Sequence, residues 1–266
     1  MRADRRTFIK IAGLAVLGLG TKPAISVLAG EDPTVAGTSA KSIPAPTSPP
    51  LLGRRWALVV DLSKWHDDAK DCIEACHREH NVPHFEDSKI EIKWIWEEPF
   101  ENVFAESSHQ FVSTHLKEMH VPVLCNHCDN PPCVRVCPTR ATWKNEENGI
   151  VMMDMHRCIG CRFCVAACPY GSRSFNWVDP RLGLDTENLT SDFPTRTRGV
   201  VEKCTFCYER LAKGLAPACV EASKHKALVF GDLDDPKSEV RRLLESRYAI
   251  VRRPNLGTKP QVYYII

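Results

Sequence analysis

The sequence predicts an α+β fold in which short strands and short helices form two interleaved modules around groups of cysteines. Eleven of the 13 cysteines in the 266-residue chain stand in three closely spaced runs. Short segments rich in β-branched and aromatic residues flank the runs, as is typical of short strands. Proline and glycine inside the runs favour tight turns of the backbone. We therefore expect bound metal, together with apolar side chains, to hold the core together.

Two runs are complete, because each has four cysteines and a proline directly after the fourth. The second has the spacing C-x2-C-x2-C-x3-C-P, with which bacterial ferredoxins give three thiolates to one iron-sulfur cluster and the fourth to a neighbouring cluster. The first, C-x2-C-x4-C-x3-C-P, differs only in a longer loop. Exchange of the fourth ligands predicts two [4Fe-4S] clusters, one bound by Cys125, Cys128, Cys133 and Cys168 and the next by Cys158, Cys161, Cys164 and Cys137.

The third run stops one ligand short. It consists of Cys204, Cys207 and Cys219, and its fourth place is occupied by Ser223. Upstream, Cys72 and Cys76 keep the C-x3-C ending of a further run. By the same exchange of fourth ligands, Cys76 completes the third run, which predicts a third [4Fe-4S] cluster.

A fourth cluster is predicted to be lost. Its ligand places would be His66, Ala69, Cys72 and Ser223, and three of these four carry no thiol. Cys72 is then expected to be a buried remnant. The other twelve cysteines are the predicted metal ligands, and no residue is predicted to be catalytic.

The modules follow from the order of the runs and of the segments between them. Strands are expected at Trp56–Val60, Ile90–Trp96, Gly149–Asp154 and Ser174–Val178. Short helices are expected after each fourth cysteine, and otherwise helix is expected only at Glu239–Arg247. Residues 115–185 are the predicted inner ferredoxin-like module. Residues 51–114 and 186–266 are the predicted outer module with a C-terminal extension.

Other metal chemistry fits the cysteine spacing less well. Zinc sites use two separated cysteine pairs, whereas these runs have four cysteines and a trailing proline. The segment from Cys72 to His77 departs from the C-x-x-C-H spacing of haem attachment. His66 as an imidazole ligand would still leave the fourth cluster incomplete. A binding module stabilised by metal stays open as the alternative from another class.

The N-terminus predicts export. Residues 1–29 have the features of a twin-arginine signal, because Arg5–Arg6 precedes a mild apolar stretch that ends at Gly20. That stretch is too short to span a membrane, although an uncleaved signal would tether the protein. We therefore expect the protein in the periplasm or on the extracytoplasmic face of the membrane. Residues 30–50 are rich in Pro, Ser, Thr and Ala and are expected to be a flexible linker.

Charge excludes one class of partner. The signal carries five positive residues and one negative, so its removal changes the formal net charge from +2 to −2. Each oxidised cluster with its four thiolates adds about −2, which gives the holoprotein about −8. A nucleic-acid partner is not expected for such a protein. No apolar stretch of 18 residues follows the signal, so no membrane span is expected there either.

The runs and their surroundings resemble the four-cluster ferredoxin-type electron-transfer subunits of the dimethyl-sulfoxide-reductase and NrfC-like systems, from Trp56 to the C-terminus. The shared motifs are Cys125-Asn126-His127-Cys128, Asn130-Pro131-Pro132-Cys133, Lys203-Cys204-Thr205-Phe206-Cys207, Gly214, Pro217-Ala218-Cys219 and Gly257-Thr258-Lys259-Pro260. The missing cluster and the export signal most resemble DsrO-type subunits, the periplasmic iron-sulfur subunits of the transmembrane Dsr complex.

The resemblance implies a non-catalytic subunit that relays electrons. The implied partners are an NrfD-like integral membrane subunit that interacts with quinone, and a haem c or other iron-sulfur subunit. The implied process is sulfur or sulfite respiration, and the alternative is a nitrite, polysulfide or molybdopterin reductase. A relay conducts only if the lost cluster lies at one end of the row, which we therefore expect.

Overall fold

The structure is a computed structural model that describes residues 48–107 and 109–266. The described residues belong to one compact unit, 46–266. The predicted signal at 1–29 lies outside the described residues, and so does nearly all of the predicted linker at 30–50. Within the described ranges, no helix is both long enough and apolar enough to cross a membrane.

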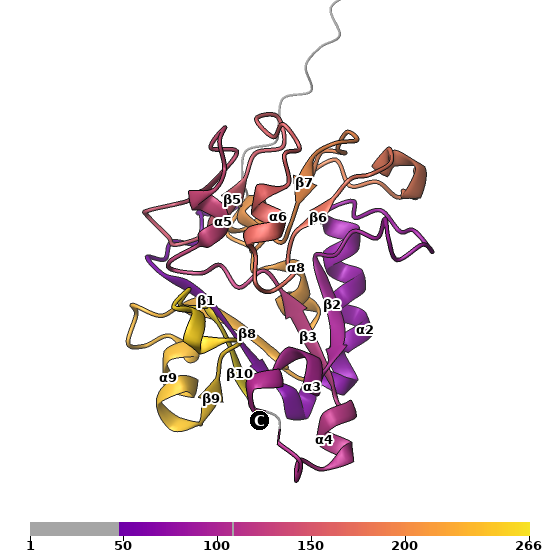
Figure 1. Cartoon of the computed structure of the whole chain (residues 1–266). Helices are drawn as coiled ribbons and strands as arrows, with labels where there is room; N and C mark the ends of the chain where they lie inside the picture. The colour runs from indigo at the N-terminus through magenta and orange to yellow at the C-terminus, as the bar shows by residue number, and fades with distance from the viewer. Residues whose placement is uncertain (1–47, 108) are drawn as a thin grey trace, which may run out of the picture. The chain divides into compact units, whose positions relative to one another are not determined.

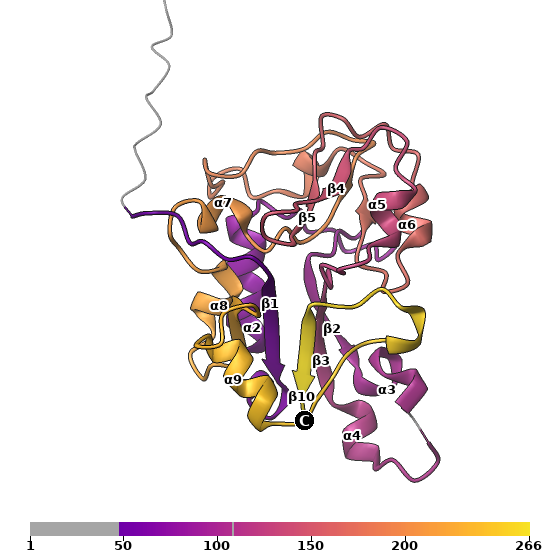
Figure 2. The same ribbon diagram turned by 90° about the vertical axis from the view of Figure 1, so that its left-hand side faces the viewer.

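A four-stranded sheet lies at one end of this unit (Figure 2). Its strands, in spatial order, are β8 (Leu228–Asp232), β1 (Trp56–Asp61), β10 (Val262–Ile265) and β9 (Ala249–Ile250). β1 runs parallel to β10 and antiparallel to β8, and all six of its residues are buried. Its alternating side chains separate two cores, since Leu58 and Val60 face the main core whereas Ala57 and Val59 face the core under α9 (Glu239–Ser246).

The longest helix, α2 (Leu62–Glu79), follows β1 directly and runs beside β2 and β3 (Figure 1). Asp61 caps it by accepting a hydrogen bond from the Ser63 amide. The sequence prediction of little helix before residue 239 is therefore wrong. The buried side chains recur every three or four residues, as on one face of a helix: Leu62, Trp65, Asp68, Cys72, Ala75 and Cys76.

Three two-stranded sheets complete the strand content. They pair β2 (Ile95–Pro99) with β3 (His120–Leu124), β4 (Thr142–Lys144) with β5 (Val151–Met153), and β6 (Ser174–Phe175) with β7 (Val201–Glu202). The strand predicted at Ile90–Trp96 begins only at Ile95. One reason is local, because the Lys93 amide donates to Ser174 Oγ at 2.8 Å and not to the backbone of a neighbouring strand.

The remaining helices are short. They are α3 (Phe100–Val103), α4 (Thr114–Glu118), α5 (Pro132–Arg135), α6 (Phe163–Ala167), α7 (Tyr208–Leu211) and α8 (Ala218–Ala222), with 3-10 turns at Ala105–Ser107, Pro180–Gly183 and Pro254–Leu256. In the two complete runs the helix begins one residue before the third cysteine and ends before the fourth, so its predicted place after the fourth is wrong. The predicted α+β class is confirmed, with the loops of α5 and α6 at one end of the unit and the sheet of β1 at the other (Figures 1 and 2).

Candidate iron-sulfur sites

The three cysteine loops share one unusual backbone position. The residue before the second cysteine has a positive φ in each: His127 (41°), Gly160 (68°) and Phe206 (54°). Bulky residues rarely adopt this left-handed conformation, so its recurrence marks a functional constraint. It turns successive amides toward the inside of the loop, where they can face anionic sulfur. The incomplete third run therefore has the loop geometry of the two complete runs.

The predicted exchange between the complete runs brings Cys137 beside the second run. Cys137 lines one small cavity with Cys158, Cys161 and Cys164. Burial acts to raise the pKa of Cys137, but hydrogen bonds from the Thr142 amide and neighbouring groups outweigh it and lower the pKa. A thiolate is thus favoured at the position from which the first run is predicted to donate its fourth ligand.

The other predicted set of the complete runs also comes together. Burial, followed by the neighbouring thiols of Cys125, Cys133 and Cys168, raises the pKa of Cys128 to about 12, although a hydrogen bond from Thr258 opposes the shift. Burial and then Cys125 likewise raise the pKa of Cys168. Thiols that shift one another in this way lie close together. Metal binding resolves the conflict, because a coordinating thiol is deprotonated outright.

Cys76 reaches the third run from α2. Its pKa is raised well above the ordinary value by burial and then by Cys219, Cys207 and Cys204. Backbone amides already point at two of these sulfurs, since Phe206 N lies 3.4 Å from Cys204 Sγ and Ala218 N lies 3.4 Å from Cys207 Sγ. Cys76 therefore lies close enough to the three cysteines of the third run for their charges to act on its buried thiol.

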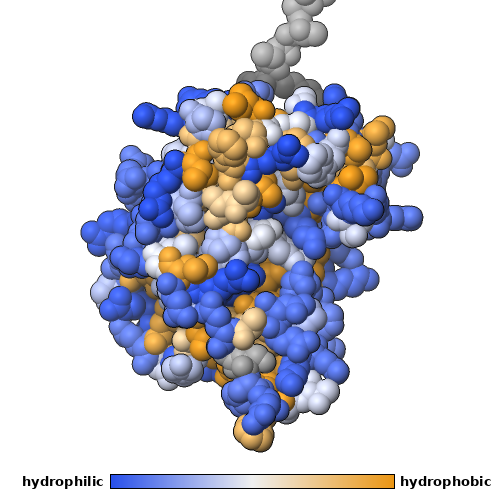
Figure 3. Space-filling model, viewed as in Figure 1, coloured by the Kyte–Doolittle hydropathy of each residue, from blue (hydrophilic) through white to orange (hydrophobic). Residues whose placement is uncertain are grey.

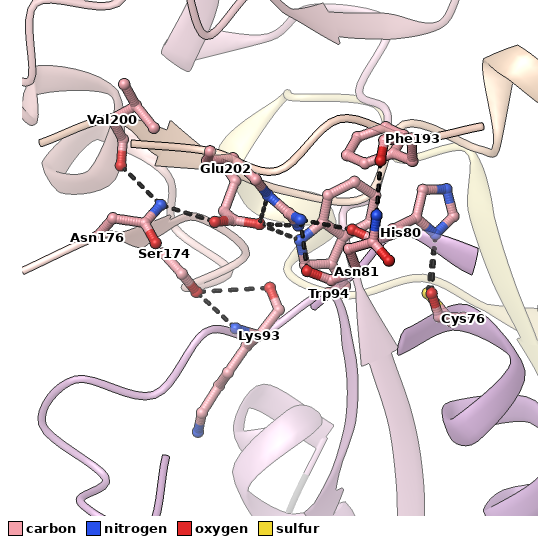
Figure 4. A network of polar contacts seen from close by, with 11 residues as sticks. Cys76, His80, Asn81, Lys93, Trp94, Ser174, Asn176, Phe193, Val200 and Glu202 are labelled. Carbon is pink, nitrogen blue, oxygen red and sulfur yellow. Dashed lines mark hydrogen bonds and ion pairs between the residues drawn. The ribbon is translucent and has the colours of Figure 1, made fainter. Parts of the chain in front are cut away.

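A buried network holds Cys76 in this position (Figure 4). Arg196 and Glu202 form an ion pair whose side chains are each 1% exposed. Arg196 Nη1 also donates to the carbonyls of His80 and Asn81, at 2.5 and 2.6 Å. Glu202 accepts hydrogen bonds from Trp94 and Asn176 as well, at 2.8 and 2.7 Å. Because Cys76 lies one helical turn before His80 and Cys204 lies two residues after Glu202, the network ties the two ligand segments together. We call it the Arg196–Glu202 clamp.

Single thiols link the three predicted ligand sets in order. Burial raises the pKa of Cys164, Arg173 opposes this, and Cys133 adds to it, so the sets of the two complete runs are neighbours. Burial and then Cys125 raise the pKa of Cys204, so the Cys76 set also borders the first run. After burial and Cys204, Cys72 raises the pKa of Cys219, so the predicted ligand places of the lost cluster, which we call the vacated place, border the Cys76 set. We call this order, from the Cys137 set through the middle set to the Cys76 set, the row.

Hydrogen bonds fill the vacated place. Asp68, one turn before Cys72, is 1% exposed and accepts a hydrogen bond from Ser223 Oγ at 2.5 Å. The amides of His225 and Ala227 donate to the same carboxylate oxygen at 3.0 and 3.3 Å. His66 projects into solvent with its side chain 98% exposed, and Ala69 is half-buried. The four predicted places thus do not converge on one point, and α2 runs unbroken through three of them.

Two buried cations, which sequence reasoning missed, lie among the cysteines. Arg173 is 4% exposed and Lys203 is 1% exposed. Neither forms an ion pair with a carboxylate within the described residues. Burying an isolated charge is strongly unfavourable, so a counter-charge is required. Anionic clusters held by the surrounding thiolates supply it, and the donor set of this region therefore fits [4Fe-4S] clusters. Each cation directly precedes or closely follows a cysteine run, but no pattern in the sequence predicts its burial.

A single bound metal ion fits these sites less well than a cluster. Across residues 48–107 and 109–266, no three His, Cys, Asp or Glu side chains converge tightly enough to share one ion. A cluster presents four irons, so its four thiolates bind around it rather than at one centre.

Comparisons with known proteins agree with this chemistry. A family model described as a 4Fe-4S dicluster domain matches residues 116–182 and 190–233. Residues 183–189, which lie in the long loop after the second run, fall outside the match. The matched segments contain all three cysteine runs but not Cys76.

Several similar proteins cover most of the chain. The chain is 39% identical to the Hdr-like menaquinol oxidoreductase iron-sulfur subunit 1 of Archaeoglobus fulgidus, over 98% of this chain and 97% of the relative. It is 38% identical to the menaquinone reductase iron-sulfur cluster-binding subunit of Nitratidesulfovibrio vulgaris, over 79% and 88%. It is 36% identical to the arsenate respiratory reductase iron-sulfur subunit ArrB of a Shewanella species, over 79% and 96%.

Fold, sites and relatives define an iron-sulfur electron-transfer protein that carries [4Fe-4S] clusters. The chain belongs to the family of ferredoxin-type electron-transfer subunits of the NrfC and dimethyl-sulfoxide-reductase kind. Its relatives are the iron-sulfur subunits of oxidoreductase complexes, and the chain is a non-catalytic subunit of the same sort. The predicted family and the predicted lack of catalysis are both confirmed.

Proposed function

We propose that this protein is a periplasmic relay with three [4Fe-4S] clusters. The ligand sets are those predicted from the sequence, with Cys76 completing Cys204, Cys207 and Cys219. The observation that carries the proposal is the approach of Cys76, from α2, to the three cysteines of the third run. Each cluster, when bound, accepts and releases one electron. The chain supplies the order of the sites, the burial that excludes water and the backbone amides that face the sulfurs.

The proposed partners follow from the names of the relatives. Two of them are subunits of a menaquinol oxidoreductase and a menaquinone reductase. We assign to this chain an NrfD-like integral membrane subunit that interacts with quinone, and a haem c or second iron-sulfur subunit as the other redox partner. Sulfur or sulfite respiration of the Dsr kind is the proposed setting. The signal at 1–29 supports export by the twin-arginine route with clusters already bound.

The end of the row at Cys137, Cys158 and Cys161 is the proposed contact with a redox partner. These three cysteines are only partly buried, whereas Cys76, Cys204, Cys207 and Cys219 are all buried. Exposed apolar residues surround them, including Ile159 (67%), Phe163 (59%) and Trp177 (45%). Figure 3 shows apolar side chains gathered over the end of the unit that carries α5 and α6.

Charge indicates what binds this apolar surface. Arg135 and Arg162 are exposed at its edge, and Arg162 lies 4.7 Å from the Trp177 ring centroid. The holoprotein as a whole is acidic, so this local positive charge selects a partner face rimmed by carboxylates. Encounters between redox proteins use small interfaces of this kind, below about 1,200 Å².

Isolation of the native complex tests the proposed function. This subunit, separated anaerobically from the purified complex, is expected to contain about twelve irons and an equal amount of sulfide, without zinc. A membrane subunit and a haem spectrum are expected in the same preparation, and menaquinol is expected to reduce the clusters. Zinc without sulfide would favour the metal-stabilised binding module. A co-purifying molybdopterin subunit would favour the alternative assignment to a molybdopterin reductase.

A further inference from the structure

The three sites differ in the charges buried beside them. Two buried cations border the middle site of the row, which consists of Cys125, Cys128, Cys133 and Cys168. Arg173 lies at its junction with the Cys137 site, and Lys203 lies at its junction with the Cys76 site. With the proposed ligand sets, these charges affect how easily the cluster at each site accepts an electron.

Arg173 contacts the middle site directly. Its Nη2 lies 3.1 Å from Cys133 Sγ and donates to Thr142 Oγ1 at 2.8 Å. Nη1 lies 3.7 Å from the Met153 sulfur. Arg173 is 4% exposed and follows Cys168, the last cysteine of the second run, by five residues. The guanidinium, which stays charged in proteins, thus lies at the junction of the two complete runs.

Lys203 occupies the junction on the other side. Its Nζ donates to the carbonyl of Val151 and, at 2.7 Å, to the carbonyl of Cys204. His127 and Phe206, one from each loop, stack at the same junction with ring centroids 3.7 Å apart. Lys203 is 1% exposed, so its ammonium is a buried cation at this junction.

Each outer site borders only one of these two cations, whereas the middle site borders both. The Cys137 site shares Arg173 through Cys164, and the Cys76 site shares Lys203 through Cys204. At the Cys76 site the other buried cation is Arg196, and Glu202 neutralises it within the clamp. The carboxylate of Glu209, two residues after Cys207, places a negative charge near Cys207 and Cys204. At the Cys137 site the nearest cation at the edge, Arg162, is exposed, so water screens it.

Reduction adds one negative charge to a cluster. A buried positive charge nearby favours the reduced form, and hydrogen bonds to the sulfurs and burial set the remainder of the reduction potential. We propose that Arg173 and Lys203 make the cluster bound by Cys125, Cys128, Cys133 and Cys168 the most easily reduced of the three. Electrons then rest in the middle of the row and leave toward either end.

A redox titration of the anaerobically purified holoprotein, followed by paramagnetic resonance, tests this. The middle cluster is recognised as the one whose reduced signal becomes coupled to two different neighbours as these are reduced in turn. In the wild type it is expected to be reduced first. In Arg173→Gln and in Lys203→Gln, its equilibrium constant for reduction is expected to fall at least tenfold, a shift of about 59 mV for one electron. Arg173→Lys, which keeps the charge, is expected to retain most of the wild-type value.

Arg140→Gln is the matched control, because Arg140 belongs to the first run's loop but is exposed. Its titration is expected to match that of the wild type. Iron and sulfide contents separate a charge effect from a loss of structure, and the two variants test the proposal independently. An unshifted middle cluster in both glutamine variants with full iron content would overturn the proposal. So would a wild type whose outer clusters are reduced first. A wrong number of clusters would instead contradict the proposed function, and the iron content alone shows it.

Discussion

The region from Cys125 to Cys168 and the region that joins α2 to α8 begin from the same cysteine pattern and end in different structures. In the first, loops with left-handed residues wrap around thiols and only short helices form. In the second, the upstream run has lost two of its cysteines and has become the 18-residue helix α2. The comparison teaches that ligand spacing dictates a loop only where the first two cysteines of a run are present, as they are in the incomplete third run but not in α2.

The two cysteines that remain in α2 have different roles. Cys72 and Cys76 are four residues apart, so they lie on the same helical face. Cys76 still reaches the third run, whereas Cys72 is fully buried with its pKa raised to about 12, mainly by burial and then by Asp68. Where a metal centre would have been, a carboxylate with donors from three residues now joins α2 to the segment after α8.

Breaking the Arg196–Glu202 clamp is expected to have the largest effect on stability and cluster content. Glu202→Gln leaves Arg196 as an uncompensated buried charge, which destabilises by about 3–5 kcal/mol. Because the clamp ties Cys76 to Cys204, the third cluster is expected to be lost, leaving about eight irons. Iron and sulfide analysis measures this.

The exposed pair Arg181–Asp179 provides the control for the clamp. Its side chains are 56% and 39% exposed, so Asp179→Asn is expected to retain all clusters. A Glu202→Gln protein with undiminished iron would contradict the structural role assigned to the clamp.

Removing the carboxylate of the vacated place is expected to have the next largest effect. Asp68→Ala leaves Ser223 Oγ and two amides without their buried acceptor, which destabilises by about 3 kcal/mol. This corresponds to a fall of roughly 5–10 °C in the midpoint of thermal unfolding. Asp67→Asn, an exposed neighbour, is the control with no expected shift. Equal midpoints for the two variants would show that the hydrogen bonds of Asp68 are not needed.

The same carboxylate predicts a dependence on pH. Burial raises the pKa of Asp68, but hydrogen bonds from Ser223, His225 and Ala227 prevail and lower it below 3.8. A lowered folded-state pKa stabilises the protein above the unfolded value, and this stabilisation is lost as the pH falls below about 4. Thermal unfolding at several pH values is expected to show a smaller acid-induced loss in Asp68→Asn than in the wild type. Parallel curves would contradict this.

The apolar end of the row is expected to affect rate rather than stability. Phe163→Ser is expected to slow electron transfer to the partner subunit several-fold, and Arg135→Glu to remove the dependence of that rate on salt. Both are expected to keep full iron content. Stopped-flow measurements with the native partner provide the test, with Tyr248→Ser, 83% exposed outside the patch, as the control. Equal rates in all variants would place the contact elsewhere.

Restoring the missing cysteines is expected to have the smallest effect. The triple variant His66→Cys, Ala69→Cys and Ser223→Cys completes the fourth set on paper. Since α2 is a continuous helix with Asp68 bonded inside the vacated place, no further cluster is expected, and the iron content stays near twelve. A gain of about four irons would show that the lost cluster was removed by its ligands alone.

Much of the site could be predicted from sequence because cluster ligands obey strict spacing. The cysteine runs and the strand at β1 are local patterns of this kind. The cysteine spacing within α2 predicts a cluster loop, whereas the apolar face that recurs at 3.6 residues predicts the helix that the structure has. The Asp68 bonds, the Arg196–Glu202 clamp and the burial of Arg173 join residues far apart in the sequence. A charged residue in a sequence gives no sign of the distant partner that permits its burial.

The central claim is that Cys76 replaces the missing fourth ligand of the third run. The most direct test compares Cys76→Ser with Cys72→Ser, two thiols on one face of the same helix. Iron and sulfide analysis with paramagnetic resonance is expected to give about eight irons and two signals for Cys76→Ser, and about twelve irons and three signals for Cys72→Ser. Twelve irons in Cys76→Ser, or a loss in Cys72→Ser instead, would contradict the account.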